Sequence, residues 1–163
     1  MNSAISDRRT APFLVLLASL ASLGIAFASQ YWGGLQPCIL CIYQRYPYGV
    51  AAVLGVVGLL LVARPTLLRA VLLLAAIVFF VDAGIAFFHV GVEHHWWEGT
   101  AQCGSTLSPN LTPEELEQQL LQTPLTPCDR PAWSLFGISM AGYNFVYATV
   151  CGLATLWVAA RQR

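Results

Sequence analysis

The sequence predicts an all-α integral membrane protein, a bundle of four transmembrane helices with a long external loop that carries a short helix. The 163 residues are 57% hydrophobic and only 10% charged, whereas soluble globular domains carry about 25% charged residues. The mean hydropathy is +0.64, and the net charge is zero. All eight basic residues are arginine, and they form no cluster that would suit a nucleic-acid backbone. This composition argues against a soluble enzyme, a disordered chain and a nucleic-acid binder.

The spacing of the charges predicts the membrane spans. Runs of 35, 18 and 30 uncharged residues separate successive charges, and a further run from Arg69 to Glu93 is interrupted only by Asp82. A spanning helix needs about 20 mostly apolar residues. The first span lacks a convincing signal-peptide cleavage site, so we expect it to be retained. We expect a single membrane domain over residues 1–163, with spans at about 11–31, 44–62, 67–89 and 137–160.

Arginine placement predicts the orientation of these spans. Six arginines fall on one side of the expected membrane: Arg8, Arg9, Arg64, Arg69, Arg161 and Arg163. The other side has Arg45 and Arg130, together with six acidic residues. Arginine and lysine are enriched in cytoplasmic loops, so both termini should be cytoplasmic and the loops at about 32–43 and 90–136 external.

The long external loop contains a helix signal of its own. Thr112, Pro113 and Glu115 suit a helix N-cap, a first helical position and a capping acid. The helix should extend to about Gln122 and end before Pro124. It either lies on the membrane surface or is a solvated loop helix.

Four of the five cysteines fall in the two external loops. Cys38 and Cys41 form a CxxC motif in the short loop, and Cys103 and Cys128 lie 25 positions apart in the long loop. Thiols outside the cytoplasm are oxidised or redox-active by default. Cys151, inside the fourth span, should be a small buried apolar residue.

The CxxC motif is placed for thiol chemistry. It follows Pro37 and precedes the second span, so its sulfurs should lie at a helix N-terminus, where unpaired N–H groups favour a thiolate. Arg45 is four residues after Cys41, and we expect its charge to lower the pKa of Cys41. The alternatives for this motif are a structural disulfide and a metal site.

The second pair is less specific by itself. A bridge between Cys103 and Cys128 would stabilise the fold by roughly 3–4 kcal/mol in the loop-entropy treatment. Neighbouring glycine and proline residues suggest exposed positions, where disulfides are labile. A zinc site formed by the four loop cysteines with His94 and His95 is the metal alternative. The second pair lacks zinc-knuckle spacing and the oxidising side disfavours free thiolates, so we predict no metal.

Three segments resemble the DsbB family of bacterial inner-membrane disulfide-forming proteins. They are the Cys38–Arg45 segment (CILCIYQR), the Cys103 and Cys128 pair, and the Trp133–Met140 segment (WSLFGISM). The expected four-span layout matches as well. The resemblance implies a multi-pass protein of the bacterial inner membrane, with a periplasmic long loop. It also implies a thiol oxidase that re-oxidises a periplasmic, thioredoxin-fold DsbA-like partner and passes the electrons to membrane quinone, either ubiquinone or menaquinone.

The resemblance also implies roles for individual residues. Cys38 and Cys41 would be the quinone-coupled pair, with Cys41 next to the quinone ring and Arg45 assisting quinone binding. The partner would attack Cys103, whose disulfide mate is Cys128. A Cys38–Cys103 bridge is the rearranged intermediate that we expect.

The family also has a histidine, following a glutamate near the outer end of the third span, that is linked to the quinone site. Glu93-His94 matches this feature, and His89 and His95 are alternatives. Asp82, inside the third span, either belongs to a proton path for quinone reduction or is a polar residue packed between helices.

Two other functions remain open from the sequence. A vitamin K epoxide reductase-like enzyme also combines four spans, a CxxC motif and quinone, but its active motif lies near the end of a late span. A non-enzymatic four-span adaptor would carry the two cysteine pairs as inert structural disulfides.

Overall fold

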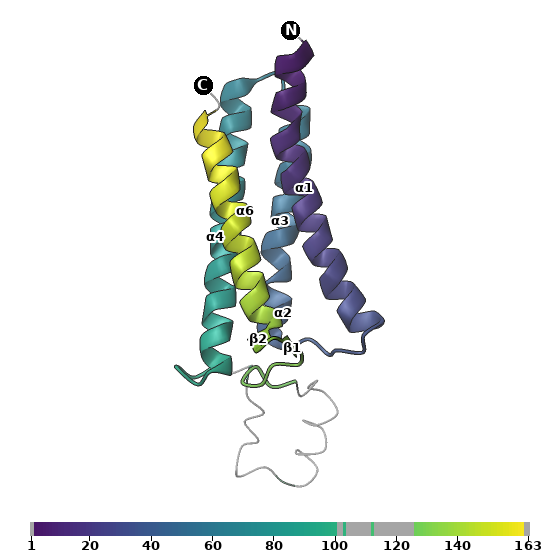
Figure 1. Cartoon of the computed structure of the whole chain (residues 1–163), viewed down its shortest axis with the longest axis vertical. Coiled ribbons are helices and arrows are strands. Elements are labelled where there is room, and N and C mark those ends of the chain that lie inside the picture. Colours follow the sequence, from purple (N-terminus) through teal and green to yellow (C-terminus); the bar gives the residue numbers. More distant parts are fainter. Residues whose placement is uncertain (1, 101–102, 104–111, 113–125, 162–163) are drawn as a thin grey trace.

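The computed structural model describes residues 2–100, 103, 112 and 126–161, and is mostly helical (Figure 1). The expected loop helix at residues 113–122 lies outside the described residues. The described elements are α1 (Asn2–Tyr31), α2 (Ile39–Tyr43), α3 (Arg45–Leu60), α4 (Pro65–Glu93), β1 (Ser134–Leu135), β2 (Ile138–Ser139) and α6 (Met140–Arg161).

The four long helices form one bundle. α1 packs on α3, α3 on α4, and α4 on α6. Figure 1 shows the first turn of α1 and the last turn of α6 at one end of the bundle, with α2, β1 and β2 at the other. The expected arginine-rich side and the expected cysteine-bearing side therefore lie at opposite ends.

Three of the helices are long and apolar enough to cross a membrane, namely Arg8–Tyr31, Pro65–Glu93 and Met140–Arg161. α3 has 16 residues, which corresponds to about 24 Å of helix. Only Gln44 separates it from α2. The expected second span is therefore a short helix preceded by one further helical turn.

The helix ends follow from local sequence. Pro65 occupies the first turn of α4, where its missing N–H costs nothing. Residues Leu61–Arg64 make the tight turn from α3, in which the Arg64 N–H donates to the Leu61 carbonyl at 2.8 Å. At the start of α6, the Gly142 N–H donates to Ser139 Oγ at 3.1 Å. Ser139 thus caps the first turn of that helix.

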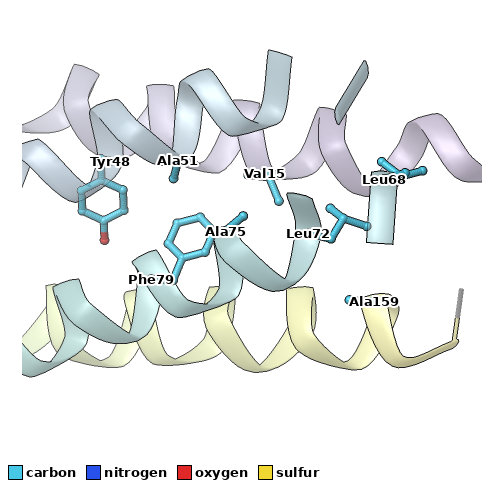
Figure 2. Packing of buried hydrophobic residues seen from close by; sticks show 8 residues of the cluster. All are labelled: Val15, Tyr48, Ala51, Leu68, Leu72, Ala75, Phe79 and Ala159. Atoms are coloured by element: carbon cyan, nitrogen blue, oxygen red, sulfur yellow. The ribbon is translucent and has the colours of Figure 1, made fainter. Parts of the chain in front are cut away.

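The core lies between α3 and α4 and extends to α1 and α6. Figure 2 shows this cluster: Val15, Tyr48, Ala51, Leu68, Leu72, Ala75, Phe79 and Ala159. Small residues allow the helices to approach closely. A Cβ at Gly55 would lie 2.8 Å from the backbone N of Leu16, and one at Gly58 would lie 2.7 Å from Cβ of Pro12. Helix packing by close contact at small residues is typical of membrane bundles.

A short hairpin precedes α6 where a continuous helix from residue 137 was expected. Leu135 pairs with Ile138, and Phe136 and Gly137 occupy the turn with φ of 52° and 80°. Positive φ at both central residues is the geometry of a tight two-residue hairpin turn. The fourth long helix therefore begins at Met140, three residues later than the charge pattern indicates.

Candidate active site

The CxxC motif lies at the start of α2. Cys38 is the N-cap residue, and its Sγ accepts a hydrogen bond from the Cys41 backbone N–H at 3.3 Å. The two sulfurs lie 3.0 Å apart as free thiols, and Cys38 is 4% exposed. The expected position at a helix N-terminus is confirmed, and the sulfur nearest the free N–H groups belongs to Cys38.

The electrostatics of the pair differ from the expectation that Arg45 lowers the pKa of Cys41. Hydrogen bonding from the Cys41 thiol and from His89, whose Nε2 lies 3.5 Å away, lowers the pKa of Cys38 to about 4 despite burial. The neighbouring Cys38 thiolate and burial raise the pKa of Cys41. The expected lowering of the Cys41 pKa by Arg45 is not found: Cys38 receives the hydrogen bonds, and Arg45 is not among the groups that shift the pKa of Cys41.

The second pair forms a disulfide between Cys103 and Cys128. The Cys128 N–H donates to the Cys103 carbonyl at 3.2 Å, and Thr100 Oγ1 donates to Cys103 Sγ at 3.4 Å. The sequence suggested exposed positions, but Cys103 is 5% and Cys128 0% exposed. Both pack in one buried cluster with Cys38, Leu40 and Val92. The fold thus brings together two cysteine pairs that are far apart in the sequence.

A cavity of about 700 Å³ lies beside the CxxC motif. Its walls are mostly apolar residues of α1 and α6, and Cys41, Arg45 and His89 also line it. The lining side chains of Ile25 and Val146 are more than half exposed, so the cavity opens sideways between α1 and α6. Its volume suits a small organic ligand.

Arg45 is held at the wall of this cavity. Its NH1 donates to Gln30 Oε1 at 2.7 Å, and its guanidinium carbon lies 4.9 Å from the centre of the Phe27 ring. Its Nε is buried and has no hydrogen-bond partner among the described residues. A buried guanidinium donor without a protein acceptor is suited to an oxygen atom of a ligand.

The three histidines occupy different environments. His89, 3% exposed, contacts Cys38 and lines the cavity. His94 is exposed and stacks on Trp96, with the ring centres 5.4 Å apart. His95 Nδ1 lies 3.3 Å from the Val92 carbonyl. The structure therefore brings His89, and not His94, to the cysteines.

A sequence signal for His89 did exist. Asp82, Ala86 and His89 are all buried along one face of α4, at spacings of four and three residues. Gln44 and Asn144, which the sequence analysis did not single out, also contact this group.

Three groups here could hold a metal ion. The sulfurs of Cys38 and Cys41 and a ring nitrogen of His89 all lie within 4.8 Å of one another. The expected zinc alternative required four free cysteines, but Cys103 and Cys128 are joined to each other. That four-cysteine site is therefore not formed.

Comparison with known proteins identifies the family. The family described as "Disulfide bond formation protein DsbB" matches residues 8–158 of this chain. The chain belongs to the DsbB family. Members of the DsbB family are generally quinone-dependent thiol oxidoreductases.

Relatives of the DsbB family align along most of their length. Disulfide bond formation protein B of Xanthomonas campestris pv. campestris is 33% identical over 158 residues, covering 94% of this chain and 91% of the relative. Disulfide bond formation protein B of Haemophilus influenzae is 32% identical over 147 residues, covering 86% and 80%. An uncharacterized protein of Rickettsia prowazekii is 29% identical over 143 residues, covering 86% and 81%. No solved structure matches this chain.

Proposed function

We propose that this DsbB-family protein is a thiol oxidase of the bacterial inner membrane. It takes electrons from a periplasmic, DsbA-like dithiol protein through two cysteine pairs and passes them to membrane quinone. The observation that carries the proposal is the shared buried cluster of Cys38, Cys103 and Cys128, with Cys41 on the wall of the adjoining cavity. Inert structural disulfides would not need this proximity.

Exchange begins at the outer pair. A thiolate of the partner attacks Cys103 Sγ, the bond to Cys128 breaks, and Cys128 leaves as a thiolate. Cys128 then attacks Cys38 Sγ and releases the Cys41 thiolate. Because the partner occupies Cys103 at this stage, the bridge to Cys38 comes from Cys128, which replaces the Cys38–Cys103 bridge expected from the sequence.

The remaining steps return the outer pair to its bonded state. The partner's second thiolate attacks the mixed disulfide, so the partner leaves oxidised and Cys103 becomes a thiolate. Cys103 then attacks Cys128, which leaves Cys38 and Cys41 reduced by two electrons.

The residues at the cavity fit a quinone. A bound quinone would accept two electrons and two protons, and the CxxC disulfide would form again. Arg45 offers its free buried Nε–H to an oxygen atom, and the apolar walls exclude water. The opening between α1 and α6 would let a lipid-soluble ring enter from the bilayer.

The environment of Cys38 favours electron acceptance. A thioredoxin-like CxxC is too reducing to oxidise a strongly oxidising partner. Stabilising the Cys38 thiolate stabilises the reduced form of the pair, and so raises its reduction potential. Each unit of pKa lowering is about 1.4 kcal/mol, and for two electrons this amounts to about 30 mV.

We further propose that all four long helices cross the membrane, with both termini cytoplasmic. The 16 residues of α3 fall short of the roughly 20 that a span needs, and the flanking residues Gln44, Leu61 and Val62 supply most of the remainder. The six-to-two split of arginines along the sequence, in which Arg45 and Arg130 are the two, supports this orientation.

The test is quinone-dependent oxidation of a reduced thioredoxin-fold dithiol protein by the purified chain in detergent. Each quinone reduced should match the loss of two partner thiols, that is, the formation of one partner disulfide. Cys41→Ser should abolish both, whereas Cys151→Ala should retain both because Cys151 belongs to neither pair. Partner oxidation that proceeds without quinone, or survives Cys41→Ser, would contradict the proposal.

A further inference from the structure

His89 connects the reactive cysteine to a chain of buried amides. Its Nε2 lies 3.5 Å from Cys38 Sγ, and its Nδ1 lies 3.0 Å from Gln44 Nε2. Glu93 Oε1 is 3.8 Å from Nε2, which is beyond hydrogen-bond distance. The nearest acceptor for a proton on Nε2 is therefore the sulfur of Cys38. Which ring nitrogen carries the proton depends on what Gln44 offers to Nδ1.

The orientation of the Gln44 amide is determined at one end by a backbone carbonyl. Gln44 Nε2 lies 3.1 Å from the Leu40 carbonyl, which can only accept a hydrogen bond. The atom facing that carbonyl must therefore be the NH₂ group, and the same group faces His89 Nδ1. Nδ1 then accepts a hydrogen bond, and the proton of a neutral ring lies on Nε2.

The hydrogen bonds at the Asp82 end of this series are consistent with the same orientation of the Gln44 amide. Asn144 Nδ2 donates to Asp82 Oδ2 at 2.9 Å and to Gln44 Oε1 at 2.8 Å. Tyr48 OH donates to Asn144 Oδ1 at 2.6 Å. Asp82 is 0% and Gln44 7% exposed, and the printed partners of Asp82 Oδ2 and of Gln44 are protein groups, whereas Asp82 Oδ1 has no partner among the described residues. Both ends agree on which amide atoms donate.

We infer that Gln44, oriented by Asn144 and Asp82, is a positioning residue that holds the proton of His89 on Nε2, directed at the Cys38 sulfur. Three helices and one junction contribute to this chain of hydrogen bonds, called the relay below. Asp82 and His89 come from α4, Asn144 from α6, Tyr48 from α3, and Gln44 from the junction of α2 and α3. The relay keeps a donor on the thiolate of Cys38 without requiring a charged imidazole. In this relay the role of Asp82 is to orient the Asn144 amide, which in turn orients Gln44.

Several titratable or charged groups surround His89. Cys38 and Glu93 face its ring, and Cys41 and Arg45 share its cavity wall. Asp82 and Tyr48 are linked to it through Asn144 and Gln44. A direct measurement of the proton position is therefore preferable to a rate profile alone.

Nitrogen NMR of the histidine ring measures that position. The reduced, quinone-free protein is labelled with ¹⁵N-histidine in detergent micelles, and His89→Gln identifies the His89 resonances against those of His94 and His95. In the unsubstituted protein we expect a protonated Nε2 and an unprotonated Nδ1. The opposite tautomer in the reduced protein would overturn the inference.

Two substitutions of Gln44 test the cause. Gln44→Met removes the donor, so the His89 signals should shift toward a mixture of tautomers. The Cys38 thiolate absorbance should then titrate at a pH higher by about one unit. Gln44→Glu retains a side chain of the same length but presents only acceptors, so it should place a proton on Nδ1. Gln30→Met, a matched control whose side chain bonds only Arg45 among these groups, should leave the His89 signals unchanged.

The outcomes separate this inference from the proposed function, on which it rests for its catalytic meaning. Unchanged His89 signals in Gln44→Met would overturn the relay, even if the chain oxidises its partner normally. Conversely, the expected tautomers in a chain without quinone-dependent activity would support the relay and refute the proposed function. If Gln44→Met does not fold, Gln44→Glu and the unsubstituted protein still decide the question.

Discussion

Cys38 and Cys41 differ in environment although only two residues separate them. Cys38 accepts hydrogen bonds from the Cys41 N–H and, in the relay, from His89, whereas Cys41 lies on the cavity wall. The two sulfurs therefore suit different tasks. Cys38 is buried among the other cysteines and can exchange with them, and Cys41 can face a ligand.

This difference predicts an unusual pH dependence of the reduction potential of the pair. Cys38 has its pKa lowered to about 4 and Cys41 has its pKa raised, so between pH 5 and 8 the reduced pair holds one thiolate and one thiol. Reduction then takes up one proton for two electrons. The potential should fall by about 30 mV per pH unit, instead of the roughly 59 mV expected for two protons.

The measurement uses glutathione buffers and thiol trapping on quinone-free protein in which the other three cysteines are replaced by alanine. Below the Cys38 pKa the slope should steepen, because both thiols are then protonated. His89→Gln removes one donor from Cys38 and should move this break to higher pH. A slope near 59 mV per unit throughout would show that Cys38 is not a thiolate in this range.

Arg45 carries a second prediction at the residue scale. Arg45→Met retains much of the apolar stem but removes the charge and the free Nε–H, so the quinone concentration for half-maximal rate should rise about 10- to 100-fold. The maximal rate should also fall, because negative charge develops on the quinone oxygen. Arg45→Lys should restore function only in part, since lysine lacks the planar fork.

Steady-state kinetics at varied quinone concentration check this expectation. Arg64→Met is the matched control, because Arg64 is exposed in the turn after the last residue of α3, whereas Arg45 is its first residue. Arg45 is not among the groups that shift the pKa of Cys41, so we expect no change in the ionisation of Cys41. Unchanged kinetics in Arg45→Met would leave Arg45 only the role of anchoring a helix end.

At the scale of elements, the charge-free runs predicted the long helices well. Such runs reflect the exclusion of charge from apolar surroundings, which acts along the whole length of a helix. The hairpin before α6 was missed because its strands have two residues each, too few to show a period of two. The burial of Cys103 and Cys128 was missed because it depends on packing against Cys38 and Val92, and no local pattern encodes that contact.

The two cysteine pairs should carry out different halves of the reaction: the Cys103–Cys128 pair meets the partner and the CxxC pair meets the quinone. Cys103→Ser removes the sulfur that we propose the partner attacks, so partner oxidation should fall to background. The CxxC pair keeps its contact with the cavity, and added quinone should still oxidise it in detergent. Thiol trapping of Cys38 and Cys41, alongside a partner assay, checks both halves, with Cys151→Ser as the matched cysteine control. Normal partner turnover in Cys103→Ser would refute the proposed exchange between the two cysteine pairs.

At the scale of the whole molecule, the two ends of the bundle differ in chemistry. The ends of α1 and α6 and the turn between α3 and α4 carry arginine, whereas the other end carries the two cysteine pairs. An even number of crossings is required for both chain ends to lie on one side. The short α3 is therefore the decisive element, because a chain with only three crossings would place Arg163 opposite Arg8.

Reporter fusions test this arrangement. A reporter after Arg163, or inserted at Pro65, should be active only as a cytoplasmic fusion, because the arginines around these positions favour that side. A reporter inserted within residues 105–125 should be active only outside the cytoplasm. An external reporter at Arg163 would mean that α3 does not cross or that the bundle is inverted. If Cys103 were then cytoplasmic, its disulfide would face a reducing compartment, and a periplasmic dithiol partner could no longer reach it.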